Sequence, residues 1–285
     1  MFLLKSKENI GIFFAISAYL SFAILDAIQK YTVINHSIFQ ILMVKYLFVL
    51  FLSVFESKRK KNYFFYYSKK FKFQILRSFL SIIESGCFVF SFRYLSLADV
   101  HSIGSITPVI VVALSALILR EFVSIKIWIA IFVGFIGMLI ILRPGSTIFD
   151  FYSIVPLCGA FFLGLYQIIT RKVSEYDSNE TSLFYTGILG SIIMSILLIF
   201  YWQPLNLLSL VLLGGGGVFF SMGIYLQIQA LSNARASIIQ PFHYTLIFWA
   251  ILFGYILYND MPDIFTIFGA LIIAVSGTYV LIRRN

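Results

Sequence analysis

The amino-acid sequence predicts an all-α integral membrane protein with ten transmembrane helices, and three observations lead to this class. Of the 285 residues 60% are hydrophobic and only 12% are charged, whereas soluble domains carry about 25% charged residues. Apolar runs of the length that crosses a bilayer as a helix, about 17–25 residues, follow one another along the chain. Basic residues gather in alternate connections between these runs. A soluble fold of this size could not cover so much apolar surface with polar groups.

The apolar runs that predict helices are separated by short polar or charged connections. In order, they cover residues 10–29, 38–55, 74–95, 100–119, 125–142, 152–170, 182–201, 206–229, 236–257 and 263–282. Pro108 and Pro241 interrupt the fourth and ninth runs and predict kinks there. Four consecutive glycines at 214–217 lie in the eighth run. They predict either a close helix–helix approach or a locally broken helix that lines a cavity.

Two long stretches share one plan, which indicates a diverged duplication. Residues 98–145 read as a proline-interrupted helix, a charged turn and a glycine-bearing helix, and residues 234–284 repeat this order. We therefore divide the chain into residues 1–145 and 150–285, with five helices in each half. Because five is odd, the second half must enter the membrane from the opposite side. The sequence thus predicts two inverted repeats, an arrangement found in many secondary transporters.

The distribution of basic residues predicts the orientation. Seventeen of the 21 Lys and Arg residues fall in connections on one side of the membrane, and Lys45 lies within a helix. The other side holds only three, which are Lys30, Arg93 and Arg143. By the positive-inside rule both termini are cytoplasmic, and we expect a multi-pass protein of the cell inner membrane. The basic and aromatic segment 58–72 is expected beside anionic membrane lipid, not beside nucleic acid.

Charged side chains inside the apolar runs are the first candidates for function. Asp26, Lys45 and Glu84 lie in the first three runs. Each costs roughly 2.5–3.5 kcal/mol at the centre of a lone inserted helix, so each should face a partner or the bundle interior. The helical rise puts Glu84 near the midplane, and Lys45 can pair with either Glu84 or Asp26. We expect a structural ion pair or a contact to substrate or a coupling proton.

Hydrogen-bonding side chains of the second half complete the predicted substrate-binding set. These are Gln167, Gln240, His243, Tyr244 and Trp249. His243 follows a helix-breaking proline, so it either titrates in a proton-coupled cycle or forms ordinary hydrogen bonds. Trp249 lies deep in the ninth run, which predicts a cavity wall or buried packing. Because both signs of charge lie near one depth, a zwitterionic substrate is favoured over a sugar or a purely cationic drug.

Several classes of function lack their sequence signals here. The chain has no HExxH, GxSxG or Walker A pattern and no Cys or His pairs at metal-ligand spacing. We therefore expect no enzyme, no cofactor, no metal and no direct use of ATP. Three hypotheses remain: a secondary transporter, an intramembrane enzyme, and a non-transporting assembly or lipid-handling subunit. The three charges at membrane depth favour the transporter.

Four segments resemble ten-helix members of the drug/metabolite transporter superfamily, of the EamA-domain type. They are LDAIQKY, RSFLSIIESGCFVFSFRYLSLADV, PVIVVALSALILREFVSIKIWIAIFVGFIGMLIILRPG and PFHYTLIFWAILFGYILYNDMPDIFTIFGALIIAVSGTYVLIRR. The chain is most similar to the bacterial subgroup that includes S-adenosylmethionine and riboflavin uptake carriers. Members of that subgroup often have Glu at the position of His243 and Arg at the position of Lys45.

This resemblance, together with the buried charges, implies a permease that works by alternating access on a small organic metabolite. We expect an amino acid or an S-adenosylmethionine-like compound, with a drug, nucleoside or vitamin carrier of the same superfamily as the alternative. Protons are the expected coupling ion if coupling occurs. A monomer and a homodimer are both compatible with the sequence.

Overall fold

The computed structural model describes residues 2–142 and 151–259, with short pieces at 264–265, 267–269, 271–272 and 275–276. All regular structure in these residues is helical, and they contain no strand. Eight of their helices are long and apolar enough to cross a membrane, and a shorter apolar helix covers Ile125–Ile140. The predicted all-α class of multi-span membrane protein is therefore confirmed. The tenth predicted run, 263–282, lies largely outside the described residues.

The helices follow the predicted runs closely. They are α1 (Phe2–Asn35), α2 (Ile38–Arg59), α3 (Phe71–Tyr94), α4 (Leu97–Gly104), α5 (Thr107–Leu114), η1 (Ser115–Leu119), α6 (Ile125–Leu142), η2 (Phe151–Ser153), α7 (Ile154–Val173), α8 (Asn179–Tyr201), α9 (Leu207–Asn233), α10 (Ala236–Ile239), η3 (Gln240–Tyr244) and α11 (Thr245–Tyr258). Four of them begin with a side-chain N-cap, from Ser37, Ser96, Ser178 and Asn206. Each cap accepts a hydrogen bond from the backbone amide three residues later, which satisfies an otherwise unpaired donor.

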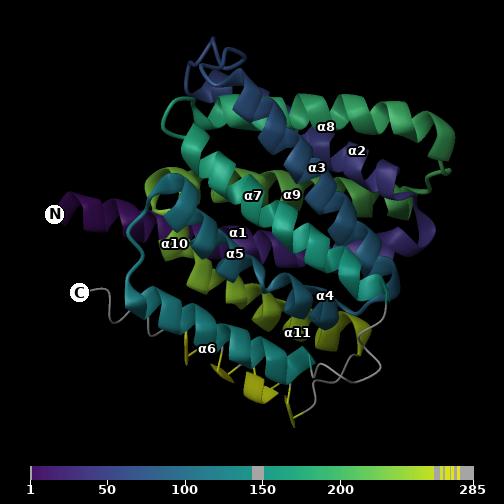
Figure 1. The fold of residues 1–285 in the computed structure, drawn as a ribbon. Helices are drawn as coiled ribbons and strands as arrows, with labels where there is room; N and C mark the ends of the chain where they lie inside the picture. Colours follow the sequence, from purple (N-terminus) through teal and green to yellow (C-terminus); the bar gives the residue numbers. More distant parts are fainter. Residues whose placement is uncertain are drawn as a thin grey trace.

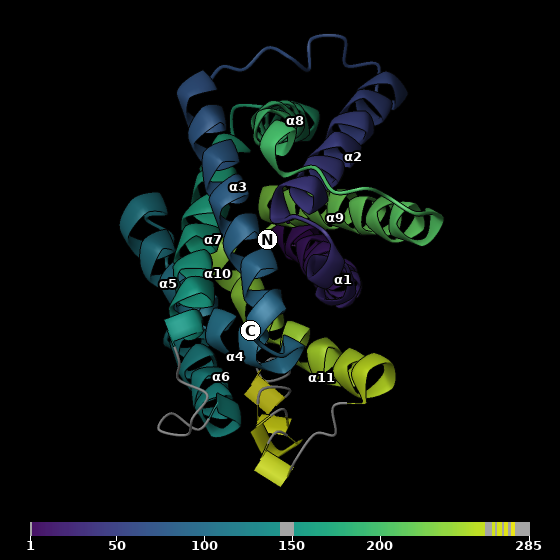
Figure 2. The ribbon, with the colours of Figure 1, turned by 90° about the vertical axis from the view of Figure 1, so that its right-hand side faces the viewer.

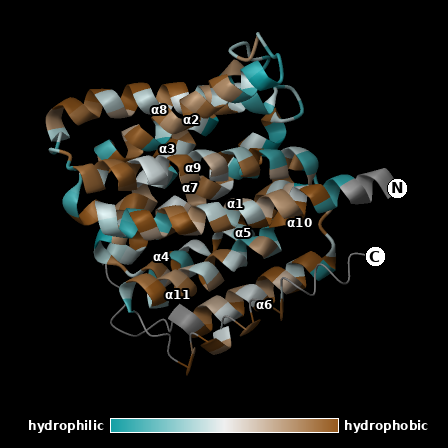
Figure 3. Ribbon diagram, turned by 180° about the vertical axis from the view of Figure 1, so that it is seen from behind, coloured by the Kyte–Doolittle hydropathy of each residue, from teal (hydrophilic) through white to brown (hydrophobic). Residues whose placement is uncertain are grey.

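The long helices form a bundle whose members run roughly along one direction (Figure 1). From the side, α1, α2 and α9 lie in one group and α3, α5 and α7 in another, with α8 between α2 and α3 (Figure 2). Hydrophobic residues cover most of the length of the helices, and polar residues concentrate at their ends (Figure 3). The turn that follows α2 and the start of α1 lie at the same end of the bundle (Figures 1 and 3).

The most extensive helix contacts are α1 with α9, α2 with α8 and α3 with α7. Each of these pairs joins a helix from the first half of the chain to one from the second half. If α1, α2 and α3 are exchanged with α7, α8 and α9 in order, the α1–α9 pair becomes the α7–α3 pair. The α2–α8 pair is unchanged by the exchange. The packing of the described helices therefore has an approximate twofold pattern.

Two membrane-length segments are interrupted, as their prolines predict. Residues 97–119 divide into α4, α5 and η1, and residues 236–258 divide into α10, η3 and α11. Proline has no amide hydrogen, so Pro108 leaves the carbonyl of Gly104 without its helical donor. The Thr107 hydroxyl supplies a replacement, because its Oγ1 donates to Gly104 O at 2.7 Å. Both segments end on a left-handed residue, Arg120 (φ 53°) and Asn259 (φ 56°).

Of the four glycines singled out in the sequence, one lies at a close helix approach, and the closest backbone approach is at another glycine. A Cβ atom would meet nothing within 4 Å at Gly214, and only ordinary contacts at Gly215 and Gly216. Gly217 alone of the four packs tightly, against the Phe48 ring, and α9 is continuous through all four. The tightest backbone approach is at Gly187 on α8, where a Cβ would lie 2.5 Å from Leu50 N on α2. The broken-helix alternative for the glycine run is therefore wrong.

The predicted outer basic residues in the described region bind helix ends. Lys30 Nζ donates to Phe92 O at 2.9 Å and to Leu95 O at 2.6 Å, at the end of α3. Arg93 reciprocates, because its guanidinium donates to Val33 O and His36 O at the end of α1. The last carbonyls of a helix lack intrahelical donors and carry partial negative charge, so cations are stabilised there. Lys30 was predicted in a connection but lies within α1, because the helix ends at Asn35, six residues beyond the predicted end at residue 29.

The predicted topology can be tested with single cysteines placed on exposed side chains at opposite ends of the bundle. In a Cys87→Ser, Cys158→Ser background, we expect Lys69→Cys to react in intact cells only with a membrane-permeant maleimide. Gln203→Cys should also react with an impermeant one, because the positive-inside rule places Lys69 in the cytoplasm. Labelling of Lys69→Cys by the impermeant reagent would reverse the assigned orientation.

The α2–α8 contact predicts a selective loss of stability. Gly187→Ala would force its Cβ against the Leu50 backbone, and overpacking of this kind costs about 1–3 kcal/mol. We expect a lower unfolding temperature for the purified protein in detergent. Gly214→Ala is the matched control, since a Cβ there meets nothing within 4 Å. Equal unfolding temperatures for the two variants would contradict the assigned α2–α8 packing.

Candidate functional site

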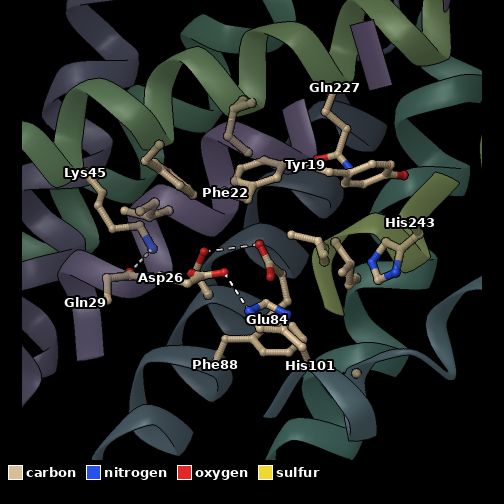
Figure 4. A pocket seen from close by; sticks show the side chains of 17 residues that line it. Tyr19, Phe22, Asp26, Gln29, Lys45, Glu84, Phe88, His101, Gln227 and His243 are labelled. Atoms are coloured by element: carbon tan, nitrogen blue, oxygen red, sulfur yellow. Dashed lines mark hydrogen bonds and ion pairs between the residues drawn. The ribbon is translucent and has the colours of Figure 1, made fainter. Parts of the chain in front are cut away.

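A cavity lies in the middle of the bundle where both interrupted segments meet the long helices (Figure 4). Its lining comes from α1, α2, α3, α4, α7, α9, η3 and α11, so both halves of the chain contribute. The charged and polar lining residues are Tyr19, Asp26, Gln29, Lys45, Glu84, Ser85, His101, Gln227 and His243. About 640 Å³ of space outside the atoms lies within this lining, its opening included.

Helix α1 supplies one continuous face of the cavity. Tyr19, Phe22, Asp26 and Gln29 all line it, and their spacing of three or four residues puts them on one side of the helix. The two proline-interrupted segments also supply polar residues to the lining. His101 lies on α4 just before the break at Pro108, and His243 lies within η3. Both histidines therefore reach the cavity from segments that proline interrupts.

Lys45 and Asp26 are joined through an amide and do not contact each other directly. Lys45 is 3% exposed, and its Nζ donates to Gln29 Oε1 at 2.8 Å. Gln29 Nε2 in turn donates to Asp26 Oδ1 at 2.7 Å. Lys45 Nζ also lies 4.1 Å from the centre of the Phe220 ring, within range of a cation–π interaction. The Gln29 amide thus satisfies a cation with its oxygen and a carboxylate with its nitrogen.

The second carboxylate oxygen of Asp26 faces a histidine. His101 Nε2 lies 3.1 Å from Asp26 Oδ2, within ion-pair distance, but forms no hydrogen bond with a described residue. The predicted direct pairing of Lys45 with Asp26 or Glu84 is therefore replaced by a Lys45–Gln29–Asp26–His101 relay. An amide can accept from the ammonium and donate to the carboxylate at the same time. Both buried charges therefore have a hydrogen bond, although they do not contact each other.

Glu84 is the least neutralised charge of the cavity. Its side chain is 7% exposed, and its one hydrogen bond among the described residues comes from the neighbouring Ser85 Oγ at 3.1 Å. No described cation lies within ion-pair distance of it. An ionised carboxylate is costly in an apolar surrounding unless a partner is present. A cation that enters the cavity could form the ion pair that Glu84 lacks among the described residues.

The predicted site residues separate into two groups. Asp26, Lys45, Glu84 and His243 line the cavity, whereas Gln167, Gln240, Tyr244 and Trp249 lie outside its lining. Gln240 Nε2 donates to Gln167 Oε1 at 2.8 Å, which joins η3 to α7. Tyr244 donates to Ile131 O at 3.0 Å, and Trp249 packs between Phe248 and Phe253. A direct role of these four in binding stays a prediction.

Five polar lining residues were not in the predicted set: Ser85, which neighbours Glu84 in the chain, and Tyr19, Gln29, His101 and Gln227. A signal existed for three of the last four. Tyr19 and Gln29 continue the α1 stripe that contains Asp26, one or two turns away along the helix. His101 stands beside a proline break in an apolar run, as His243 does. Gln227 has no such signal, because α9 carries polar residues on several sides.

A second glutamine amide lies between a cation and a carboxylate, at the end of the bundle that holds the turn at residues 60–70. Arg77 is fully buried, and its Nη1 donates to Gln74 Oε1 at 3.2 Å. Gln74 Nε2 donates to Asp177 Oδ2 at 3.0 Å. Further bonds from Arg77 reach Ser182 O and Tyr166 Oη. This cluster ties α3 to α7 and α8 outside the cavity, so it has a structural role.

A bundle of membrane-length helices around a buried charged cavity is the architecture of a carrier for small molecules. The sequence profile of the EamA-like transporter family matches residues 9–143 and again residues 151–283. The chain therefore belongs to the EamA-like transporter family, within the drug/metabolite transporter superfamily.

The individual proteins to which the chain is similar share about a quarter of their aligned residues with it. The chain is 27% identical to a riboflavin transporter of Vibrio cholerae, over 95% of its own length and 92% of that protein. It is 26% identical to an S-adenosylmethionine uptake transporter of Rickettsia bellii, over 61% of this chain and 60% of that relative. A pseudopaline exporter of Pseudomonas aeruginosa is 23% identical over 71% of this chain and 72% of the exporter. One crystal structure shares the fold, with a TM-score of 0.77 over 98% of both chains at 12% identity.

The relay predicts that Gln29 stabilises the folded protein. Gln29→Leu leaves the Lys45 ammonium and the Asp26 carboxylate without their amide partner, and hydrogen bonds to charged groups are worth about 1.5–3 kcal/mol each. We expect a clear fall in the unfolding temperature in detergent. Because Lys45→Met removes one of the stranded charges, the Lys45→Met, Gln29→Leu pair should lose less than the sum of the single losses. Additive losses would show that the relay does not couple the two residues.

Proposed function

We propose that this protein is a secondary active transporter that moves a small zwitterionic metabolite across a bacterial inner membrane by alternating access. The substrate binds in the central cavity, between helices of both halves of the chain. Amino acids and S-adenosylmethionine-like compounds are the favoured classes, and protons are the favoured coupling ion. The family gives the general activity, and the charges of the cavity support the narrower substrate class.

The observation that carries this proposal is the Glu84 carboxylate. It is only 7% exposed, its hydrogen bond comes from Ser85, and no described cation lies within ion-pair distance of it. In a low-dielectric cavity, a substrate ammonium or sulfonium beside Glu84 gains a larger Coulomb attraction than it would in water. Phe88 lies one helical turn away on the same lining, and an aromatic face adds about 0.5–2 kcal/mol for a bound cation.

Lys45 supplies the opposite sign for the other end of a zwitterion. Its ammonium donates to a neutral amide oxygen and forms no direct ion pair with a described carboxylate, so an incoming anionic group can bind it directly. A substrate carboxylate at Lys45 and an ammonium at Glu84 would complete both partial pairs in the cavity. A purely cationic or purely neutral compound would leave one of these residues without a substrate contact.

We further propose that the chain forms ten helices in two inverted five-helix repeats, residues 1–145 and 150–285, with both termini cytoplasmic. Support comes from the family profile, which matches twice, and from the exchange pattern of the helix pairs. The left-handed ends at Arg120 and Asn259 add a local correspondence between the halves. In inverted-repeat carriers the binding site lies between the repeats near the midplane, and the lining of this cavity likewise comes from both halves of the chain.

Riboflavin uptake is the second candidate. The similarity to the Vibrio cholerae riboflavin transporter extends over 95% of this chain, a larger share than the similarity to the S-adenosylmethionine carriers covers. The aromatic lining, which includes Phe22, Phe88 and Phe220, also suits a flat ring. Riboflavin has no ammonium group, so its transport should be insensitive to the charge of Glu84.

Uptake into vesicles distinguishes these candidates. We expect reconstituted protein to accumulate labelled S-adenosylmethionine or an amino acid, and an imposed proton gradient to change the rate. Glu84→Gln should lower this uptake about tenfold or more, because the cationic group of the substrate then loses a charged hydrogen-bond acceptor on the protein. Riboflavin uptake that is unaffected by Glu84→Gln would favour the second candidate and reject the zwitterion.

Glu56→Gln is the matched control for this experiment. Glu56 is another buried acid, but it binds Arg59 and Tyr225 away from the cavity lining. We expect its uptake to match that of the native protein. If none of the three labelled compounds is taken up above protein-free vesicles, the proposed substrate classes are wrong.

A further inference from the structure

The cavity has a second polar end that contains no charged residue. Tyr19 on α1, Gln227 on α9 and His243 on η3 gather on the side away from Lys45 and Gln29, while Asp26 and Glu84 lie between the two ends (Figure 4). All three side chains are buried, with 1% exposure for Tyr19 and 5% for both Gln227 and His243. They come from three separate elements, so the fold has brought them together.

Two of these side chains carry polar atoms without a partner. Tyr19 Oη and His243 Nδ1 are buried and form no hydrogen bond with any described residue. The two rings meet edge to face with their centres 5.2 Å apart, which fixes their mutual orientation. A buried donor or acceptor without a partner lowers stability, and most buried polar groups in folded proteins are bonded. A ligand that bonds to both atoms would remove this cost.

The chemistry of this end differs from that of the charged end. A tyrosine hydroxyl, a glutamine amide and a neutral imidazole each both donate and accept hydrogen bonds. Such a set matches a neutral group that carries donors and acceptors together, as the edge of a nitrogen heterocycle does. Phe22 lies between the two ends in the close-up view and offers an apolar face to a flat ring (Figure 4).

We propose that Tyr19, Gln227 and His243 form a second subsite, which binds a neutral, hydrogen-bonding ring of the same substrate whose charged group binds at Glu84 and Lys45. This inference rests on the proposed function and narrows its substrate class to two-part molecules. Each molecule has a zwitterionic head at one end and a heterocycle at the other. A simple aliphatic amino acid fills only the charged end and leaves Tyr19 and His243 without partners.

The test is equilibrium binding to the purified, full-length protein in detergent. The probe is S-adenosylmethionine, which joins an adenine ring to an aminoacyl head, and it is compared with methionine (head alone) and adenosine (ring alone). We expect the joined molecule to bind at least tenfold more tightly than either part. Equal affinities for S-adenosylmethionine and methionine would overturn the subsite, because the ring would then contribute nothing.

Conservative variants locate the ring contact. Tyr19→Phe and His243→Asn should each weaken S-adenosylmethionine binding about fivefold, the effect expected for one hydrogen bond, and leave methionine binding unchanged. Glu84→Gln should weaken both ligands. Tyr166→Phe is the matched control, since Tyr166 is a fully buried tyrosine that accepts from Arg77 outside the cavity lining. Unfolding temperatures close to that of the native protein show that each variant is folded.

The outcomes separate this inference from the proposed function. If Tyr19→Phe and His243→Asn bind every probe as the native protein does, the subsite is rejected, while binding that still depends on Glu84 supports the transporter. If the native protein binds none of the three probes, the two-part substrate class is rejected. The uptake experiment then judges the proposed function independently, through amino acids and riboflavin.

Discussion

A charge buried in an apolar helical bundle requires a polar partner, and this protein meets the requirement by placing a glutamine amide between a cation and a carboxylate. Gln29 does so for Lys45 and Asp26, and Gln74 does so for Arg77 and Asp177. Because an amide accepts at its oxygen and donates at its nitrogen, each charge keeps a hydrogen bond at a distance from its counter-ion. The two relays fix α1 against α2 and α3 against α7 and α8, and the remaining helices pack around these contacts.

The relay around Gln29 also determines which charge remains available. A direct Lys45–Glu84 pair would neutralise both residues and leave Asp26 as the remaining charge of the cavity lining. With Lys45 bound to Gln29, Glu84 retains only the bond from Ser85. The cavity therefore presents a carboxylate at one point and an ammonium at another, at a cost in stability. Under the proposed function, a zwitterionic substrate offsets that cost, and Gln29 then links stability to recognition.

The two interrupted segments, residues 97–119 and 236–258, supply two further polar side chains to the cavity lining. A continuous helix through residues 97–119 would direct every carbonyl along its axis, whereas the break at Pro108 frees the Gly104 carbonyl for Thr107. The breaks lie beside His101 and His243, which reach the cavity from opposite halves of the chain. Irregular backbone at membrane depth is tolerated where it is buried in protein or lines a cavity, and both breaks meet that condition.

The sequence by itself determined the membrane class, the position of nearly every described helix and four residues of the cavity: Asp26, Lys45, Glu84 and His243. These follow from local properties, since the cost of placing a residue in a bilayer depends mainly on that residue and its neighbours in one helix. Partner choice is not local. Whether Lys45 meets Glu84, Asp26 or Gln29, and whether Tyr19 or Trp249 faces the cavity, depends on how each helix is rotated and where it is interrupted. Only the packing of helices far apart in the chain, as at Gly187 against Leu50, sets those rotations.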